Sequence, residues 1–466
     1  MNNNKGASPL AELQGPRPAL GWRMNMLHFF RSPFRFQRQL YEQYGDLVSL
    51  GTTDKPKTIF AFGPELNRQV VANPDYFEMS TALVKIPKDT VMGQMFYNNL
   101  ILMAGEKHKQ HRRLIQPSFH HEQIVQYSKD MILLTEQLCD EWQHKQEIDV
   151  NAEMKKITQR IAVKTLMGTY KDKDLDQIGE LISQLTKSLL WVTLTPVDIP
   201  YTPYHRALRI AGQLNDYIRS MIDQKRTEPH AADVLASLVK AHDEDGAKLN
   251  DEELVGHTFT LFVAGHETTA NALTWTIFLL NQHPNVLSNL IEELDGAVQQ
   301  GTVSMDKINK LPLLEGVIKE SLRLLPPASI GTRVTAVPCE LNGITIPAST
   351  NVFFSQFITH RIPELYSEPN RFKPERWLDF KPSPFEYLPF STGPHMCVGW
   401  YFAMVELKIV LSILLRRYRI GITRNAKISP NLMMRPVHGM PARRVKQDRA
   451  FVREPVRGTI NELVDF

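Results

Sequence analysis

Helical periodicity dominates the chain between residues 64 and 328, where apolar side chains recur every three to four residues. We expect amphipathic helices at 123–146, 151–166, 174–190, 204–226, 231–241, 251–281, 285–300 and 314–324. The segment 251–281 is apolar on most faces, so it should be buried on all sides. This pattern predicts a mainly α fold built around that one helix.

Strands are predicted only outside this helical region. A helix at 33–44, with Ser32 as its N-cap and Gly45 at its end, comes before the first two strands. After residue 328 short strands return, followed by a proline-rich meander and one strong helix. The predicted strands are 47–50, 58–62, 332–337, 339–341 and 345–346; the meander covers 361–389 and the last helix 400–417.

The two ends of the chain differ from its middle. Residues 1–22 are polar and punctuated by proline and glycine, which is typical of a flexible lead-in. Residues 447–466 are charged and end apolar, which fits either a disordered tail or a docking segment. We therefore expect one large domain at 23–446.

The composition narrows the class of protein. Of the 466 residues, 42% are hydrophobic and 22% charged, which allows a core large enough to enclose an apolar cofactor. The net charge of +4 does not favour nucleic-acid binding, which needs a concentrated basic face. No apolar run is long enough for a signal peptide or a membrane span, so we expect a soluble, cytoplasmic protein. The three cysteines, Cys139, Cys339 and Cys397, are far apart, which argues against a disulfide framework or a zinc site.

A cysteine between two glycines is the strongest chemical signal. Residues 390–399 read Phe-Ser-Thr-Gly-Pro-His-Met-Cys-Val-Gly, and a predicted helix follows them. Gly393 and Gly399 allow tight turns and the close approach of a flat ligand. Backbone N–H groups at the helix start favour a thiolate at Cys397, and Phe390 can shield its sulfur from water. A buried structural cysteine is the alternative interpretation.

Poor helix formers interrupt the middle of the predicted central helix. Residues 264–269 read Ala-Gly-His-Glu-Thr-Thr, with a glycine and two β-branched threonines. Such a conflict is typical of a functional site, because a glycine can open the helix and make room for a small ligand. The alternative is that Thr268 and Thr269 only donate hydrogen bonds to carbonyls one turn back.

Two further patterns place charged side chains on shared helix faces. Glu320 and Arg323 have i,i+3 spacing, and Arg376 follows in the meander. His108 and Arg112 have i,i+4 spacing in a stretch rich in basic residues. For both patterns, ordinary exposed side chains are the alternative.

Taken together and in their order along the chain, the four patterns resemble the motifs of the cytochrome P450 superfamily, over about residues 44 to 443. The sequence F-x-x-G-x-x-x-C-x-G resembles that family's haem-binding loop, so the resemblance implies that the Cys397 thiolate is the fifth ligand of the iron. His395 departs from the pattern, because the family usually has arginine there; the charge of a histidine depends on pH. The implied fold is mainly α, a triangular single domain with small β-sheets and a long central helix over the haem.

The resemblance also assigns roles to the other motif residues. Thr268 would hydrogen-bond the oxygen that is being activated, and Glu267 would help to relay protons. Glu320, Arg323 and Arg376 would form a buried triad that locks the meander. The residues implied to hold haem b are Ala264, His108, Arg112, Arg333, Phe390, Gly393, His395 and Gly399.

The implied activity is the insertion of one atom of O2 into an apolar substrate, by hydroxylation or epoxidation. No flavin or nicotinamide domain follows, so we expect electrons from a separate ferredoxin or flavodoxin with its reductase, and a monomeric protein. Lys107, Lys109 and Arg113 are expected to form a positive patch for an acidic electron donor. Fatty acids, terpenoids, steroids and polyketides all stay open as substrates. The expected pocket residues are Phe259, Phe262, Val263, Ala328, Ser329, Ile330, Leu432 and Met433.

Two other functions remain open at this point. A haem-thiolate peroxygenase or isomerase would need no reductase, and a haem sensor would not turn over at all. The intact pair Glu267–Thr268 favours the monooxygenase, because neither alternative needs an acid and an alcohol for proton delivery.

Overall fold

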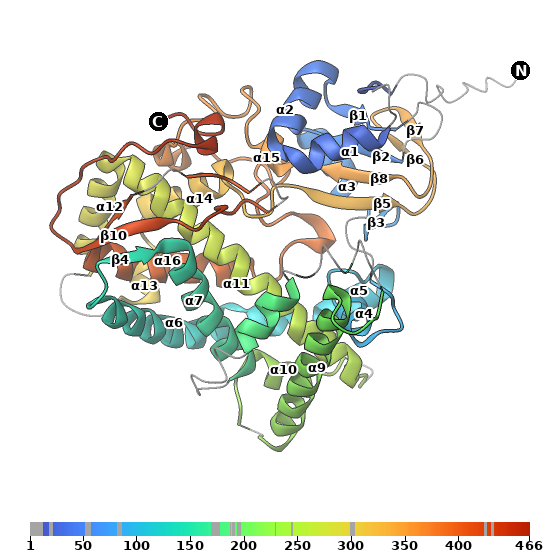
Figure 1. The fold of residues 1–466 in the computed structure, drawn as a ribbon, viewed down its shortest axis with the longest axis horizontal. Helices are drawn as coiled ribbons and strands as arrows, with labels where there is room; N and C mark the ends of the chain where they lie inside the picture. The colour runs from blue at the N-terminus through green and yellow to red at the C-terminus, as the bar shows by residue number, and fades with distance from the viewer. Residues whose placement is uncertain are drawn as a thin grey trace, which may run out of the picture.

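A long central helix organises the molecule, as the computed structural model shows (Figure 1). The structure describes residues 13–17, 22–51, 57–81, 86–168, 178–186, 188, 192, 197–228, 230–243, 246–298, 303–423, 426–429 and 433–466. The outline is roughly triangular, with α9 and α10 at one corner and the largest sheet near another.

The helices account for most of the described chain. They are α1 (Trp22–Arg31), α2 (Pro33–Tyr44), α3 (Pro64–Val71), α4 (Val91–Tyr97), α5 (Gly105–Ile115), α6 (His121–Trp142), α7 (Val150–Ala162), α9 (Pro203–Thr227), α10 (Val234–Lys240), α11 (Asp251–Gln282), α12 (Pro284–Ala297), α13 (Met305–Ile308), α14 (Pro312–Leu324), α15 (Gln356–Thr359) and α16 (Trp400–Arg417).

The strands form three small sheets. They are β1 (Leu47–Ser49), β2 (Thr58–Ala61), β3 (Phe77–Met79), β4 (Glu147–Asp149), β5 (Gly331–Thr335), β6 (Cys339–Leu341), β7 (Ile344–Ile346), β8 (Asn351–Phe354), β9 (Tyr418–Ile422) and β10 (Pro441–Lys446). The sheet orders are β1-β2-β8-β5-β3, β4-β10-β9 and β6-β7. Only β2 and β8 pair in parallel among these strands.

The central helix α11 is 32 residues long and begins with a capping box. The Asn250 side chain accepts from the Glu253 N–H, and the Glu253 carboxylate accepts from the Asn250 N–H. The helix packs against α7, α9, α14 and α16, and residues 269–282, roughly its last four turns, are buried throughout. The prediction of a central apolar helix is confirmed.

Most predicted helices are observed within a few residues of their expected ends, and α2 has the expected bounds. The predicted helix 151–166 continues from α7 as a π-helical turn at Val163–Met167. Of the predicted helix 174–190, only 178–186 and 188 lie in the described part, and they are helical. The pattern missed α1, and it missed strands that range from three residues (β3 and β4) to six residues (β10), since so few positions rarely show a clear alternation.

The expected boundaries of the domain are too narrow on both sides. Leu13 is buried beneath the largest sheet, and the carbonyl of Gln14 accepts from the Ser49 N–H at 2.8 Å. Residues 13–17 are therefore not a flexible lead-in, whereas 1–12 and 18–21 lie outside the described residues. At the other end, Ile460 and Val464 belong to the main hydrophobic core, so residues 447–466 are not a disordered tail. Across the described residues, we find no helix with the length and hydropathy of a membrane span.

Candidate active site

The loop before α16 contains a turn that requires a glycine at Gly393. Gly393 has φ +71°, and a Cβ atom there would lie 2.5 Å from the Val71 carbonyl oxygen, so a larger residue is excluded. The Cys397 N–H donates to the Phe390 carbonyl at 2.9 Å, which closes the loop. At Gly399 a Cβ would meet only Phe119, at 3.8 Å. Protein packing therefore demands glycine at Gly393 and not at Gly399.

Cys397 is exposed to solvent, although many protein atoms surround it. Burial raises the pKa of its thiol, while the Gly399 N–H and the Arg112 charge act in the opposite direction without outweighing it. The expected stabilisation by the helix start is present, but it is not sufficient for a free thiolate. A bound metal cation would supply the missing stabilisation, because it deprotonates a coordinating thiol.

Two arginines and two histidines surround this cysteine loop. The Arg112 Nη1 donates to the Met396 carbonyl at 2.8 Å, which ties α5 to the loop. Arg333 on β5 is 4% exposed, and burial lowers its pKa to about 10. The rings of His108 and His395 are in contact, with centroids 4.0 Å apart and an angle of 31° between their planes. Four residues expected to bind one ligand are thus brought together from α5, β5 and the cysteine loop.

The charges in this group come from the arginines alone. Burial, followed by His108 and the two arginines, lowers the pKa of His395 to about 3, and burial also lowers the pKa of His108. Both histidines are therefore neutral near pH 7, and His395 is there a hydrogen-bonding group without charge. A buried guanidinium without a carboxylate among its described neighbours, beside an accessible thiol, fits a ligand with carboxylates and a metal. Haem has both, so the residues present fit haem.

The middle of α11 shows an accessible face within an otherwise buried helix. Ala264 is exposed, Thr268 is half-buried, and a Cβ at Gly265 would have no neighbour within 4 Å. The helix is nevertheless α-helical throughout, so the expected local opening at the glycine is wrong. Thr268 donates to the Ala264 carbonyl at 2.7 Å, and Thr269 donates to the Gly265 carbonyl at 2.9 Å. Both threonines thus form the backbone bonds of the alternative interpretation, but only Thr268 is accessible.

Glu267 on the same helix lies between two cations. Its Oε1 is 3.6 Å from the Lys155 Nζ on α7 and 3.8 Å from an Arg435 guanidinium nitrogen in the segment before β10. Neither cation was predicted, because both come from segments distant in sequence. The two ion pairs hold the carboxylate at the edge of the accessible face.

The three residues of the expected triad meet in one buried network. Glu320 accepts from Arg323 at 2.9 Å and from Arg376 at 3.0 Å. It also accepts from the Trp377 indole at 2.9 Å and the Lys373 backbone at 3.0 Å. Burial alone would raise the pKa of Glu320, but the two arginines outweigh it and lower that pKa. The network joins α14 to the turn Pro374–Leu378 in the meander.

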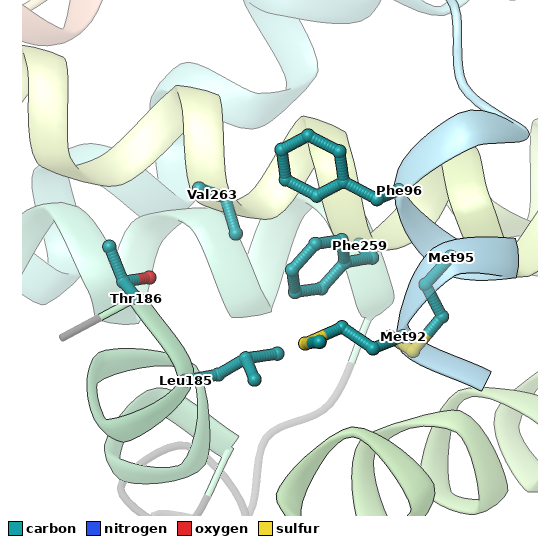
Figure 2. Close-up of a pocket in the computed structure, with 7 residues that line it drawn as sticks. All are labelled: Met92, Met95, Phe96, Leu185, Thr186, Phe259 and Val263. Atoms are coloured by element: carbon teal, nitrogen blue, oxygen red, sulfur yellow. The ribbon is translucent and has the colours of Figure 1, made fainter. Parts of the chain in front are cut away.

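An apolar hollow of about 340 Å³, measured with its open mouth, adjoins α11. Figure 2 shows its lining from three segments, namely α4, the helical segment 178–186 and α11. The lining residues are Met92, Met95, Phe96, Leu185, Thr186, Phe259 and Val263. Thr186 supplies the one hydroxyl in this lining, and that hydroxyl donates to the Ile182 carbonyl of its own helix.

Only part of the expected pocket agrees with this lining. Phe259 and Val263 line the hollow, but Phe262 is fully buried against His266, with ring centroids 5.0 Å apart. Ser329 is also fully buried. Neither Phe262 nor Ser329 is among the lining residues of this hollow. The other expected positions are Ala328, which is exposed, Ile330 and Met433, which are half-buried, and Leu432, which lies outside the described residues.

The expected positive patch is also weaker than predicted. Lys107 forms an ion pair with Glu253 at 2.9 Å, and Lys109 forms one with Glu106 at 2.6 Å. Among Lys107, Lys109 and Arg113, only the last has no ion pair within the described chain.

A buried chain of side chains, which sequence reasoning missed, ties the α4–α5 segment to α11. The Leu100 N–H donates to the His257 Nδ1 at 3.2 Å, so the proton of His257 is on Nε2, which lies 2.8 Å from the His111 Nδ1. The His111 Nε2 points to Glu253 at 3.5 Å, and Glu253 pairs with Lys107. Burial lowers the pKa of both histidines, that of His257 to about 3.

We expect this series of buried side chains to make the free energy of unfolding fall at acid pH. Above pH 6.5 His257 is neutral in both the folded and the unfolded chain, so stability is fully present there. As the pH falls from 6.5 towards 3, the unfolded chain binds a proton at His257 that the folded chain does not bind, and stability is lost. Over that window the free energy of unfolding should fall by about 1.4 kcal/mol per pH unit from this group alone. Urea unfolding of the parent and of His257→Gln, which keeps one acceptor and one donor, would measure the difference. Parallel pH profiles of the two proteins would show that His257 is not the source.

Comparisons with known proteins agree with this geometry. The family model described as Cytochrome P450 matches residues 14–445. The chain is 32% identical over 416 residues to cyclooctat-9-en-7-ol 5-monooxygenase of Streptomyces melanosporofaciens, covering 87% of this chain and 88% of the relative. It is 30% identical over 426 residues to pentalenene oxygenase of Streptomyces avermitilis, covering 89% and 92%. The fold is similar to that of retinoic acid-bound cyanobacterial CYP120A1, with a TM-score of 0.81, 23% identity and coverage of 93% and 99%.

The match over residues 14–445 defines the class of protein as haem-thiolate. The chain belongs to the cytochrome P450 family and is a monooxygenase, an oxidoreductase that uses O2 and a redox partner. The expected fold class and the expected enzyme class, a cytochrome P450 monooxygenase, are thereby confirmed.

Proposed function

We propose that this monooxygenase oxidises a cyclic terpenoid, by hydroxylation or epoxidation. The observation that carries this proposal is the lining of the hollow, in which no described residue is charged and the one hydroxyl is already bonded. A fatty acid would leave its carboxylate without a partner there, whereas a hydrocarbon ring system needs none. The names of two relatives, a cyclooctatenol monooxygenase and a pentalenene oxygenase, support the same class.

The residues of this chain have separable tasks in the proposed reaction. Haem b, when bound through Cys397, supplies the redox chemistry that activates O2. Arg112 and Arg333 would bind its carboxylates, with His108 and His395 as neutral hydrogen-bonding neighbours. The apolar lining holds the substrate and excludes water. We assign proton delivery to Thr268 and Glu267, whose carboxylate is oriented by Lys155 and Arg435.

Removal of the Thr268 hydroxyl should separate electron use from product formation. In Thr268→Ala we expect nicotinamide consumption to continue, while the product formed per electron pair falls by about 10²-fold, because the positioned proton donor is lost. Coupling is measured as product and hydrogen peroxide per nicotinamide oxidised. Thr269→Ala is the matched control, since Thr269 forms the same type of backbone bond but is buried. Equal coupling in both variants would remove Thr268 from the proton path.

The substrate proposal is tested by binding spectra of the haem-loaded protein. A cyclic sesquiterpene hydrocarbon should displace water and shift the iron towards high spin, whereas a fatty acid of equal carbon number should bind more weakly. Val263→Asp places a charge in the hollow and should abolish the terpenoid shift. Tighter binding of the fatty acid by the parent protein would overturn the terpenoid assignment.

For electron supply we propose a separate ferredoxin with its reductase, and a monomeric oxygenase. Arg113 has no ion pair among the described residues and is adjacent in sequence to Arg112, which contacts the cysteine loop; this supports an acidic donor at this face. Reconstitution with a ferredoxin and, separately, a flavodoxin would compare turnover rates. Turnover with hydrogen peroxide alone at the same rate would favour a peroxygenase instead.

A further inference from the structure

Residues 447–466, here called the C-terminal strap, lie beyond the stretch 14–445 that matches the family, yet they are packed against the core. Val456, Ile460, Leu463 and Val464 are all buried, and Ile460 is fully buried. Near the end of the strap, Phe466 contacts the rings of Phe278 and His283. In Figure 1 the strap runs from β10 along the α12 side of the molecule to the C-terminus near α14. It is therefore an integral part of this fold.

A hydrogen bond joins the end of the strap to the meander. The Asp465 N–H donates to the Asn370 carbonyl at 3.0 Å. The neighbouring carbonyls of Pro369 and Arg371 accept from the Arg323 guanidinium at 2.6 and 3.1 Å. Residues 369–371 are thus held from one side by the buried triad and from the other side by the strap.

A second buried arginine connects the strap to α14. Arg361 donates from Nη2 to the Leu324 carbonyl at 2.6 Å and to the Leu463 carbonyl at 3.1 Å. Its guanidinium lies over the Phe357 ring at 4.2 Å, and its buried Nε has no hydrogen-bond partner among the described atoms. Loss of the Leu463 carbonyl would therefore remove one of few acceptors from a buried cation, which is costly in the protein interior.

The residue before Arg361 continues the connection to the cysteine loop. The His360 carbonyl accepts from Arg323 at 2.7 Å, and its Nε2 accepts from the Leu388 N–H at 3.0 Å. Leu388 lies two residues before Phe390, whose carbonyl accepts from the Cys397 N–H. These hydrogen bonds, together with the short backbone segments 360–361 and 388–390 between them, therefore join the strap to Cys397.

We propose that the C-terminal strap is a positioning element for the haem-thiolate loop, and that Arg361 is the positioning residue through which it acts. The strap does not touch the reacting atoms. By holding residues 361 and 369–371, it keeps Cys397 in the geometry that ligates iron. This role is independent of which substrate the enzyme oxidises.

The test compares full-length holoenzyme with a chain ending at Arg457 and with Ile460→Ala. Arg449→Ala is the matched control, because Arg449 belongs to the strap but pairs with Asp295, away from the meander. The reduced carbonyl complex is followed over time, to measure conversion from the thiolate spectrum to that of a haem without thiolate. Haem transfer to apomyoglobin is measured alongside, and far-UV circular dichroism reports the overall fold.

In the truncated chain, which loses the Leu463 carbonyl, and in Ile460→Ala, which loses the buried side chain that holds the strap, we expect loss of the thiolate spectrum at least about tenfold faster than in the parent, with unchanged helicity. Arg449→Ala should behave as the parent does. If the truncated chain does not fold, Ile460→Ala decides the question. Thiolate loss at the parental rate, or loss only in step with helicity, would overturn the proposal, because the strap would then merely add stability.

Discussion

Cys397→Ser is expected to abolish the thiolate spectrum of the reduced carbonyl complex and all monooxygenase turnover. Cys397 is an exposed residue at the end of a loop whose turn requires Gly393. A serine alcohol has no comparable affinity for iron, so haem would be retained only by the arginines and the apolar walls. We expect turnover to fall below detection, a decrease of more than about 10⁴-fold, since Cys397 would hold the haem whose redox chemistry activates O2.

The remaining cysteines provide the control for this experiment. Cys339 is buried in the two-stranded sheet β6–β7, far in sequence from the loop, and burial raises the pKa of its thiol. Cys339→Ser should keep the thiolate spectrum and most of the activity. A thiolate spectrum that survives in Cys397→Ser would show that another residue binds the iron, and the assignment of the whole loop would fail with it.

The sequence predicts residue types and spacing, and the difference between a site and an ordinary surface lies in burial. Glu65 and Arg68 have the same E-x-x-R spacing as Glu320 and Arg323 and form a 2.6 Å ion pair. Both side chains of the first pair are more than half exposed, while both of the second pair are fully buried. Neither motif alone distinguishes them; the order of four motifs along the chain does.

The long helices were predictable because their periodicity extends over several turns, as α9 and α11 show. The lining of the hollow was not, because it depends on how distant segments pack. Leu185 and Thr186 face Phe259 across a gap of more than 70 residues, and nothing local marks them. Phe262 is on the same helix as Phe259 but is not in this lining, since the rotation of α11 about its axis is set by its neighbours and not by its own sequence.

The cations around Glu267 and the histidine pair show a further limit of sequence patterns. Lys155 and Arg435 approach Glu267 from either side, and His111 meets His257 across two helices. Each residue is unremarkable in its own segment. Their chemistry arises only when burial removes water and leaves one partner within reach.

Glu320→Gln is expected to produce the largest loss of stability among single substitutions that leave the haem ligand in place. The carboxylate accepts five N–H groups, from Arg323, Arg376, Trp377 and the Lys373 backbone. Glutamine removes the negative charge and turns one acceptor into a donor, which leaves the fully buried Arg323 without a counter-ion. Breaking a buried pair in this way costs about 3–5 kcal/mol, which should appear in the urea midpoint of the holoenzyme and as faster haem loss.

Glu65→Gln changes the same pattern on the exposed face of α3, where water solvates Arg68 equally well, so its urea midpoint should match that of the parent. If both variants shifted the midpoint equally, the network around Glu320 would be no more than a surface ion pair in its energetics, and the meander would have to be held by other contacts.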